Sequence, residues 1–371
     1  MEPLPKEENC FNGSEQLVSV VIPAFNGEKT IRDSIASVLS QVYKPIELIV
    51  VDDSSEDSTF EKVKECRNQV ALASYRVIRH ERNLGLSATL NHGIRESRGK
   101  YVIILHQDCT FADDSWIKKA MKCFITDRVA VVTGYYGIPP RKLRFMPRAF
   151  GIFRRQYHAV DTKQKTEEVT FSEGKCDVYR KDALEMIGGF PERFRIAGED
   201  LYVSYRLRQK GFRIVKSYGL PVVQHFDSAD NLSKNLRKEF TFGKAMGGIF
   251  PTFRTFLFRN MSNSKYSRTR SLQRAAQPLF VMGFIFMLLF GILFVSSLLL
   301  LLTGMLLIVR YVVYVTVIGK EMVCMADLFR MSRISYVQEA LVIAALGVIV
   351  DFVYTFGFCY GLILYVTGSK I

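Results

Sequence analysis

A histidine and an aspartate stand on either side of one glutamine, directly after a run of aliphatic residues. The stretch ILHQDCTF covers residues 103 to 110 and places His106, Gln107 and Asp108 where a buried strand would end. Ligand sites of parallel sheets lie just beyond the carboxyl ends of the strands. Imidazole nitrogen and carboxylate oxygen both bind divalent metals, so the stretch predicts either a metal site or an ordinary turn.

Two earlier aliphatic runs are also followed by residues that could bind a ligand. They are Pro23, Ala24, Phe25 and Asn26 in IPAFNGEKTI, and Asp52 and Asp53 in VVDDSSEDST. If the two runs are neighbouring strands, both loops border one crevice, and a nucleotide would fit there. The two carboxylates could bond a base or a ribose hydroxyl, or they could only cap the next helix.

A third group could transfer a proton. Gly198, Glu199 and Asp200 stand immediately before the helical pattern LYVSYRLRQKG. A carboxylate at this position could act as a general base that takes a proton from an attacking hydroxyl. Carboxylates also stabilise the start of any helix through its dipole. The group therefore predicts either a catalytic base or a helix start with no further role.

Strand and helix patterns that would position these groups alternate over about the first 110 residues. Buried strands are predicted at 17–23, 47–53, 75–80 and 100–108, with an amphipathic helical pattern after each of the first three. This order predicts an α/β fold with a Rossmann-like, mostly parallel sheet and flanking helices. AVVTGYYG predicts a further strand, and the segment from EGKCDVYRK to GFRIVK resumes the alternation.

The composition of the 371-residue chain changes near residue 275. Residues 277–319 are almost continuously apolar apart from Arg310, and a second apolar run at 340–366 contains Asp351. The first run is too long for one crossing of about 20 residues, so two membrane helices joined near 295–297 and a third helix are predicted. A charge such as Asp351 should face a neighbouring helix or a substrate path.

The formal net charge of +14 is unevenly distributed. Much of it lies between Arg237 and Arg274, just ahead of the first apolar run, and a basic, aromatic stretch occupies 141–155. This placement favours a membrane surface over nucleic acid as the partner. Lys320 and Arg333 flank the next polar loop, and the positive-inside rule places this loop and the amino-terminal domain in the cytoplasm. A multi-pass protein of the cell membrane is predicted.

Seven cysteines are scattered without a CxxC pair, which favours a reducing compartment over a disulfide framework or a zinc site. The polar amino terminus lacks the apolar core of a signal peptide. The predicted domains are a polar tail at 1–16, an α/β domain at 17–236, a basic juxtamembrane segment at 237–276, two membrane helices at 277–319, a cytoplasmic interfacial loop at 320–339 and a third membrane helix at 340–366.

Taken in order, the motifs resemble those of one enzyme family. They are VSVVIPAFNGEKTI, IELIVVDDSSEDST, ERNLGLSATLNHGI, YVIILHQDCTF, GGFPERFRIAGEDLYVSYRLRQKGFRI and VVQHF, and they extend from residue 17 to about 245. This series resembles the family 2 glycosyltransferases. The resemblance implies the GT-A fold and inverting transfer of a sugar from a nucleotide-sugar donor, a UDP- or GDP-sugar, with Mn²⁺ or Mg²⁺ as cofactor.

The resemblance also implies roles for individual residues. Around the nucleotide they are Pro23, Ala24, Phe25 and Asn26 framing the base, Asp52 or Asp53 bonding the base or ribose, Gly85 and Asn91 lying under the nucleotide, and Gln107 beside it. His106-Gln107-Asp108 takes the place of the family's Asp-x-Asp, so Asp108 would bind the metal. His106 would bind it too or only hydrogen-bond, and His225 would either return to the metal or be structural. Asp200 would be the base, with Gly198 and Glu199 orienting the acceptor.

The chain departs from the family pattern at several positions. Leu90 replaces a residue that is often basic, and Gly27 one that is often acidic, which leaves the choice of nucleotide open. Gln273 and Arg274 lack the tryptophan of the Gln-x-x-Arg-Trp segment of processive polysaccharide synthases, which argues against that alternative. We expect a membrane-anchored transferase acting on a polyprenyl- or dolichyl-linked glycan or polyprenyl phosphate. A non-catalytic membrane scaffold or sugar-nucleotide-binding regulator is the other alternative.

Overall fold

The chain forms two compact units, residues 1–138 with 160–225, and residues 139–159 with 226–371. The computed structural model describes residues 16–66, 74–136, 145–146, 149–150, 166–172, 174–193, 198–225, 231–259, 265–294, 296–329 and 333–367. The basic stretch at 141–155 therefore lies outside the described residues, apart from 145–146 and 149–150.

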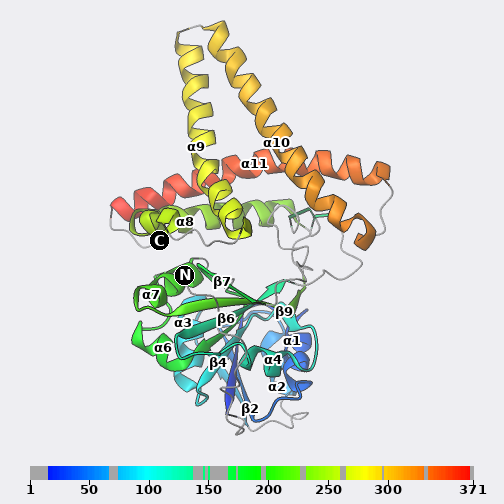
Figure 1. Ribbon diagram of the computed structural model, residues 1–371, viewed down its shortest axis with the longest axis vertical. Helices are drawn as coiled ribbons and strands as arrows, with labels where there is room; N and C mark the ends of the chain where they lie inside the picture. Colours follow the sequence, from blue (N-terminus) through cyan, green and yellow to red (C-terminus); the bar gives the residue numbers. More distant parts are fainter. Residues whose placement is uncertain are drawn as a thin grey trace. The chain divides into compact units, whose positions relative to one another are not determined.

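The first unit is a sheet with helices on both sides (Figure 1). Its strands are β1 (Val18–Ala24), β2 (Ile46–Asp52), β3 (Ser74–Arg79), β4 (Tyr101–Leu105), β5 (Cys109–Phe111), β6 (Val129–Tyr136), β7 (Thr166–Val169), β8 (Cys176–Arg180) and β9 (Arg213–Gln224). Its helices are α1 (Ile31–Leu39), α2 (Thr59–Cys66), α3 (Leu86–Glu96), α4 (Trp116–Met121), α6 (Lys181–Met186) and α7 (Glu199–Gln209). The strands predicted at 17–23, 47–53 and 75–80 agree with β1, β2 and β3 to within one residue.

Within the described residues, nine strands form one sheet in the order β3-β2-β1-β4-β8-β6-β9-β5, with β7 paired to β9. The half β3-β2-β1-β4 is parallel, as predicted. The other half is mixed, because β8 runs antiparallel to both β4 and β6, and β9 runs antiparallel to β5 and β7. From β1 the chain continues to β2 on one side of β1, and it later returns to β4 on the other side of β1. In parallel sheets, this reversal of strand order opens a crevice at the carboxyl ends of the strands.

Two separate apolar cores fix the helices on the sheet. Successive strand residues point to opposite faces, so β1 sends Val20 to one core and Val21 to the other. The first core holds α1, α2 and α4, and Trp116 of α4 is fully buried in it. The second core holds α3, α6 and α7 and includes Leu90. The position often occupied by a basic residue in the family is therefore a core position in this chain.

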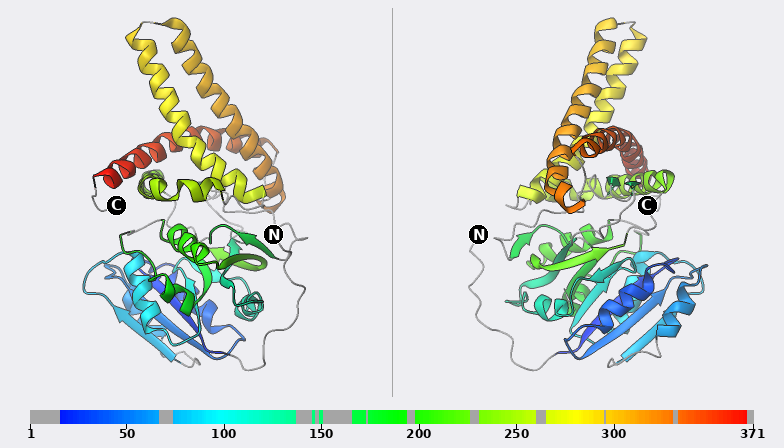
Figure 2. Two further views of the ribbon diagram at one scale, coloured as in Figure 1. Left: turned by 60° about the vertical axis from the view of Figure 1, so that its left-hand side comes forward. Right: turned by 90° about the vertical axis from the view of Figure 1, so that its right-hand side faces the viewer.

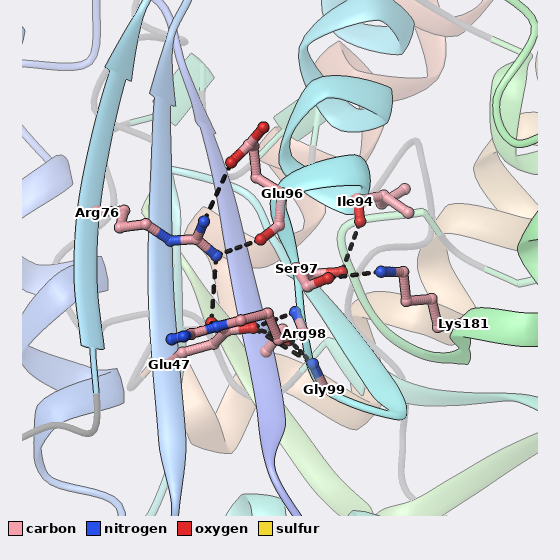
Figure 3. Close-up of polar contacts among 9 residues, drawn as sticks. Glu47, Arg76, Ile94, Glu96, Ser97, Arg98, Gly99 and Lys181 are labelled. Atoms are coloured by element: carbon pink, nitrogen blue, oxygen red, sulfur yellow. Dashed lines mark hydrogen bonds and ion pairs between the residues drawn. The ribbon is translucent and has the colours of Figure 1, made fainter.

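A buried glutamate ties the amino ends of the strands together, at the edge opposite the carboxyl ends (Figure 3). Glu47 of β2 is completely buried and accepts hydrogen bonds from Ser19 Oγ at 2.6 Å, Arg98 Nε at 3.1 Å and Arg76 Nη2 at 3.2 Å. Burial raises its pKa, but the bonds from Ser19 and Arg98 and the charge of Arg76 outweigh burial and leave the pKa below its ordinary value. Glu47 is therefore ionised at neutral pH and holds β1, β3 and the α3–β4 connection.

The second unit is helical (Figures 1 and 2). Its helices are α8 (Leu232–Arg259), α9 (Lys265–Leu293), α10 (Ser297–Phe329) and α11 (Arg333–Val366). Helices α9 and α10 form a hairpin, and α8 and α11 lie side by side. The break predicted near 295–297 lies between α9 and α10. The loop predicted at 320–339 is instead mostly helical, since α10 continues to Phe329 and α11 begins at Arg333.

Two helical stretches among the described residues are long and apolar enough to cross a membrane. They are Ser297–Thr316 in α10 and Val337–Val366 in α11. The apolar part of α9, Gln277–Leu293, is shorter. Length and composition alone would allow these two stretches to span a membrane, and the predicted three crossings stay a prediction.

The charges that interrupt the apolar runs bind each other. Asp351 of α11 is completely buried and accepts hydrogen bonds from Arg310 Nε at 2.7 Å, Tyr314 Oη at 2.6 Å and Gln277 Nε2 at 2.8 Å. The Arg310 guanidinium also lies 5.2 Å from the ring centre of Phe280. Of the two predicted environments for Asp351, the structure has the contact with neighbouring helices. A buried carboxylate costs little only when it is paired and hydrogen-bonded, and here both conditions hold.

Glycines allow α8 and α11 to approach until their backbones touch. Gly243 and Gly247 of α8 lie against the carbonyls of Tyr354 and Phe358 on α11, and Gly361 of α11 lies against the carbonyl of Lys244 on α8. A Cβ atom at any of these glycines would overlap the facing oxygen. Small residues four apart on each helix are the pattern that permits such close packing.

Substituting Gly361 by alanine should therefore loosen the second unit. The added methyl group would force α8 and α11 apart, at a cost of about 1–3 kcal/mol. Gly304→Ala in α10 is the matched control, because a Cβ there meets no atom within 4 Å. Melting of the full chain in detergent, followed by helical circular dichroism, should show a lower midpoint for Gly361→Ala alone. Equal midpoints for both variants would contradict the close approach.

Candidate active site

The carboxyl ends of β1, β2 and β4 meet, and their loops hydrogen-bond to each other. Ala24 of β1 pairs with Asp52 of β2, and the next amide, of Asp53, donates to the Ala24 oxygen at 2.8 Å. Asn26 connects the two loops, because its Oδ1 accepts from the amide of Glu56 at 2.9 Å. The predicted base-framing residues are thus held by the loop that carries the predicted carboxylates. Phe25, which is 42% exposed, presents an aromatic ring at this edge.

Both predicted carboxylates are buried, and both make hydrogen bonds or ion pairs with other groups of the protein. Asp52 accepts from the amide of Ser55 at 3.2 Å and pairs with Arg79 Nε at 3.4 Å, so it shapes its own loop. Asp53 is 4% exposed and accepts from the amide of Gly85 at 2.8 Å. Gly85 has φ of 92°, a left-handed conformation that suits glycine at the start of α3. Asp53 therefore fixes the turn that carries the predicted Gly85 contact.

Asn91 of α3 connects two segments. Its Nδ2 donates to the Phe190 oxygen at 2.7 Å, and its Oδ1 accepts from the Phe190 amide at 2.8 Å. Nδ2 also lies 3.2 Å from Glu192 Oε1. The structure thus places Asn91 as a support of the turn after α6. Its predicted position under the nucleotide stays a prediction.

Gln107 fastens the turn after β1. Its Oε1 accepts from the Phe25 amide at 2.9 Å, and its Nε2 donates to the Phe25 oxygen at 2.8 Å. A Cβ atom at Gly27 would overlap this carboxamide. The absence of the family's acidic residue at Gly27 has a physical reason here, because the side chain of Gln107 occupies the space that such a residue would need.

Asp108 and His225 are brought together by the β5–β9 ladder. The His225 amide donates to the Asp108 oxygen at 2.7 Å, and His225 Nε2 lies 3.5 Å from Thr110 Oγ1. The Asp108 carboxylate is about a third exposed, accepts from Gln224 Nε2 at 2.7 Å and lies 3.7 Å from Lys175 Nζ. His106 is tied by its backbone amide to the Lys175 oxygen at 2.9 Å. The three predicted metal ligands therefore lie on neighbouring strand ends.

The donor set suits a metal shared with a substrate. Among the described residues, no three His, Cys, Asp or Glu side chains gather closely enough to hold a metal ion by themselves. Mg²⁺ is commonly held by one or two carboxylates, with substrate phosphates and water completing its shell. Asp108 offers such a carboxylate, and the adjacent Lys175 adds positive charge for phosphate oxygens. Lys175 lies in the segment EGKCD and was not among the residues singled out from the sequence.

Glu199 and Asp200 begin α7, at the positive end of its dipole, but their environments differ. Glu199 is 7% exposed, and burial followed by the charge of Asp200 raises its pKa well above the ordinary value. Burial and the neighbouring charge thus favour the neutral form of Glu199. Asp200 is half-buried, and its Oδ1 accepts from the amide of Leu201 at 2.7 Å. Asp200 Oδ2 would lie 2.9 Å from a Cβ at Gly174, which fits closely against it.

A buried carboxylate holds the backbone of the Gly174 segment by a hydrogen bond. Asp177, the second residue of β8, is fully buried and accepts from the Gly174 amide at 2.8 Å and from Tyr179 Oη at 3.1 Å. Tyr179 in turn lies 3.2 Å from Ser172 Oγ. Burial raises the pKa of Asp177 to about 6, against the opposing effect of these hydrogen bonds. The only sequence signal for Asp177 is an aspartate inside the otherwise apolar strand pattern CDVY, and it belongs to none of the motifs described above.

Comparison with known proteins identifies the family of one domain of the chain. The model of glycosyl transferase family 2 matches residues 19–188. The chain contains a family 2 glycosyltransferase domain. Glycosyltransferase AglE of Haloferax volcanii is 26% identical over 234 residues, 61% of this chain and 72% of that protein. An uncharacterized glycosyltransferase of Haemophilus influenzae is 31% identical over 155 residues, 42% of this chain and 44% of that protein.

The GT-A fold predicted for the glycosyltransferase domain is confirmed by a solved structure. The mannosyltransferase PcManGT of Pyrobaculum calidifontis, in complex with GDP-Man and Mn²⁺, superposes with a TM-score of 0.55 over 91% of this chain and 88% of that chain. The sequence identity is 16%, so the fold is what the two share. The chain spans less than half the length of the first curated relatives it matches, 13% of an uncharacterized glycosyltransferase of Rickettsia bellii and 44% of the Haemophilus protein.

The fit between Gly27 and Gln107 in the glycosyltransferase domain can be tested by a double-mutant cycle. Gly27→Ala should displace the Gln107 carboxamide and break its two bonds to Phe25, a loss of about 1–2 kcal/mol. In the Gln107→Ala background the same change should cost almost nothing, because the space is empty. Thermal unfolding of the unsubstituted protein, the two single variants and the double variant gives the coupling free energy between the two positions. Additive effects would show that the two residues do not compete for one space.

The buried Asp177 predicts a pH dependence of stability. Unfolded aspartate has a pKa of about 3.9, so between pH 4 and 6 the folded domain keeps a proton that the unfolded chain releases. Stability that is present below pH 4 is therefore lost as pH rises through about 6, by up to about 3 kcal/mol.

Asp177→Asn cannot titrate at this position. Its stability relative to the unsubstituted protein should therefore improve steadily from pH 4 to pH 7. Unfolding midpoints of both proteins across this range provide the measurement. A difference that stays constant with pH would contradict the raised pKa of Asp177.

Proposed function

We propose that the protein is a membrane-anchored, inverting glycosyltransferase that moves one sugar from a nucleotide-sugar donor to a lipid-linked acceptor. One observation carries the proposal. The two-residue segment Gly174–Lys175 touches both chemical groups, since Gly174 fits against Asp200 and the Lys175 ammonium lies 3.7 Å from Asp108. The proposed base and the proposed diphosphate-binding carboxylate therefore flank one short segment.

In the proposed reaction the acceptor hydroxyl oxygen forms a bond to the anomeric carbon of the sugar. The bond from that carbon to the diphosphate oxygen breaks, and the nucleoside diphosphate leaves with the electron pair. Asp200 takes the proton of the hydroxyl, as a general base within reach of the attacking oxygen. Its place at the start of α7, where the helix dipole favours a negative charge, and its greater exposure than that of Glu199 suit Asp200 to this role.

The donor side would use Asp108 and its neighbours. A Mn²⁺ or Mg²⁺ ion held by Asp108, with His225 and His106 as further candidate ligands, would neutralise charge that develops on the leaving diphosphate. Lys175 would contribute to the same end from the protein itself. The complex of PcManGT with GDP-Man and Mn²⁺ supports a nucleotide-sugar donor and a divalent ion for this chain.

The acceptor side would use the membrane. Apolar side chains cover the outer surface of the α9–α10 hairpin, among them Leu279, Phe286 and Leu298, which are 73%, 62% and 64% exposed. An apolar surface of this extent suits lipid rather than water. Lys234 and Arg237 on α8 are exposed and would face anionic headgroups. A polyprenyl- or dolichyl-linked glycan, or polyprenyl phosphate, at the cytoplasmic leaflet is therefore the proposed acceptor.

Nucleoside diphosphate release by the purified full chain in lipid extract tests this proposal. The assay compares UDP- and GDP-sugars, with Mn²⁺, Mg²⁺ or chelator, and with or without the lipid. Asp200→Asn should lower the rate by at least about 100-fold, because removing a general base costs about 10²–10⁴. It should still bind the nucleotide. Asp33→Asn on the exposed side of α1 is the matched control and should leave the rate unchanged.

Three outcomes separate the parts of the proposal. An unchanged rate of nucleoside diphosphate release in Asp200→Asn would contradict the role of Asp200 as the general base. An equal rate of release with and without lipid extract would contradict a lipid-linked acceptor. Nucleotide binding without release from any donor would favour the non-catalytic alternative.

A further inference from the structure

Asp53, His80 and His92 form a hydrogen-bonded row beside the candidate nucleotide crevice. His80 Nδ1 lies 2.7 Å from Asp53 Oδ1, and His80 Nε2 lies 2.9 Å from His92 Nδ1. The two imidazole planes differ by only 9°, so the rings are aligned for this contact. The row crosses three elements, from the end of β2 to the end of β3 and then to α3. Neither histidine is among the residues to which the sequence motifs assign a role.

The chemistry of these groups determines which atom donates in the hydrogen bond between His80 and Asp53. A carboxylate only accepts hydrogen bonds, so His80 must donate its Nδ1 proton to Asp53. The opposite nitrogen of His80 then meets His92, and this contact prevents the ring from rotating away. Both Asp53 and His80 are almost completely buried, at 4% and 8% exposed. Burial and the neighbouring His80 lower the pKa of His92, which keeps that ring neutral near pH 7.

Asp53 retains capacity for one more partner. Its carboxylate accepts from His80, from the amide of Leu84 at 2.8 Å and from the amide of Gly85 at 2.8 Å. Two carboxylate oxygens offer about four acceptor positions, so these three bonds from the described residues leave about one. A carboxylate held by three donors cannot rotate, and the direction of its remaining lone pair is fixed before any ligand arrives.

We propose that His80, held by His92, is a positioning residue for nucleotide recognition by the donor site. It aims the free acceptor position of Asp53 at an N–H or O–H donor of the base or ribose. This proposal rests on the proposed function, since it needs a nucleotide in the crevice between the loops after β1 and β2. The recognised group is a hydrogen-bond donor, because a carboxylate cannot recognise an acceptor.

A purely structural histidine would give a different result from a positioning one. Loss of His80 would destabilise the domain in either case, because Asp53 would lose a buried partner. Only a positioning residue acts on nucleotide affinity through Asp53. A double-mutant cycle on affinity separates the two roles, since a residue that works through another has no effect once the other is gone.

The experiment measures the dissociation constants of UDP and GDP by calorimetry with the full chain. The variants are His80→Ala, His80→Asn, His92→Ala, Asp53→Asn and the double variant His80→Ala with Asp53→Asn. His80→Ala should weaken binding about tenfold, the scale of one well-placed hydrogen bond. His80→Asn should bind within about threefold of the unsubstituted protein, because its amide places an N–H near the Nδ1 position. Glu81→Gln, on the adjacent exposed residue, is the control and should bind normally.

In the Asp53→Asn background, His80→Ala should change affinity less than about twofold. The dissociation constant of His92→Ala should lie between those of the control and His80→Ala. Equal effects of His80→Ala in both backgrounds, or no effect in either, would overturn the positioning role even if sugar transfer is real. Failure of the unsubstituted protein to bind UDP or GDP would instead overturn the proposed donor class, and the role of His80 with it.

Discussion

The parallel pairing of β1 with β2 on one side and β4 on the other is the constraint on which the first unit depends. It brings three strand ends to one edge of the sheet, so that residues more than 80 positions apart, such as Phe25 and Gln107, share hydrogen bonds. The buried Glu47 anchors the amino ends of the same strands, so the sheet is tied at both edges. With the strands fixed in this way, the loops at the carboxyl ends need little further support.

Those loops are held mainly by one another. Asp53, Gln107 and Asp177 each use a side chain to hold the backbone of a different loop, at the turns of Gly85, Phe25 and Gly174 respectively. This arrangement fixes the backbone before a ligand binds, which is the condition for strong electrostatic effects at a reacting centre. It also explains why several predicted ligand contacts are occupied by the protein itself. If a nucleotide binds there as proposed, these residues would contribute to binding by fixing the loops around it, and Asp53 would in addition contact it.

Much of the fold could be predicted, because β1 to β4 are aliphatic runs at regular spacing and the parallel order follows from the helices between them. The antiparallel half could not, since β5 and β7 are short and lack a hydrophobic period. At the site, the position of Asp108 after a strand was visible, and so was Asp200 before a helix. The partnership of Lys175 with Asp108, and of His80 with Asp53, joins residues far apart in sequence. One sequence contains no signal for such pairs, and the glycine contacts between α8 and α11 were missed for the same reason.

The pairing of Arg310 with Asp351 has a consequence for how the protein is made. The two residues are separated by 41 positions, so Arg310 is synthesised well before its partner Asp351. Until α11 arrives, a helix placed in a bilayer would hold Arg310 without its carboxylate, which costs several kcal/mol in hydrocarbon. If α10 and α11 cross a bilayer, as their length and composition allow, α10 would be expected to remain at the protein-conducting channel until α11 joins it. The ion pair would then make the insertion of the two helices interdependent.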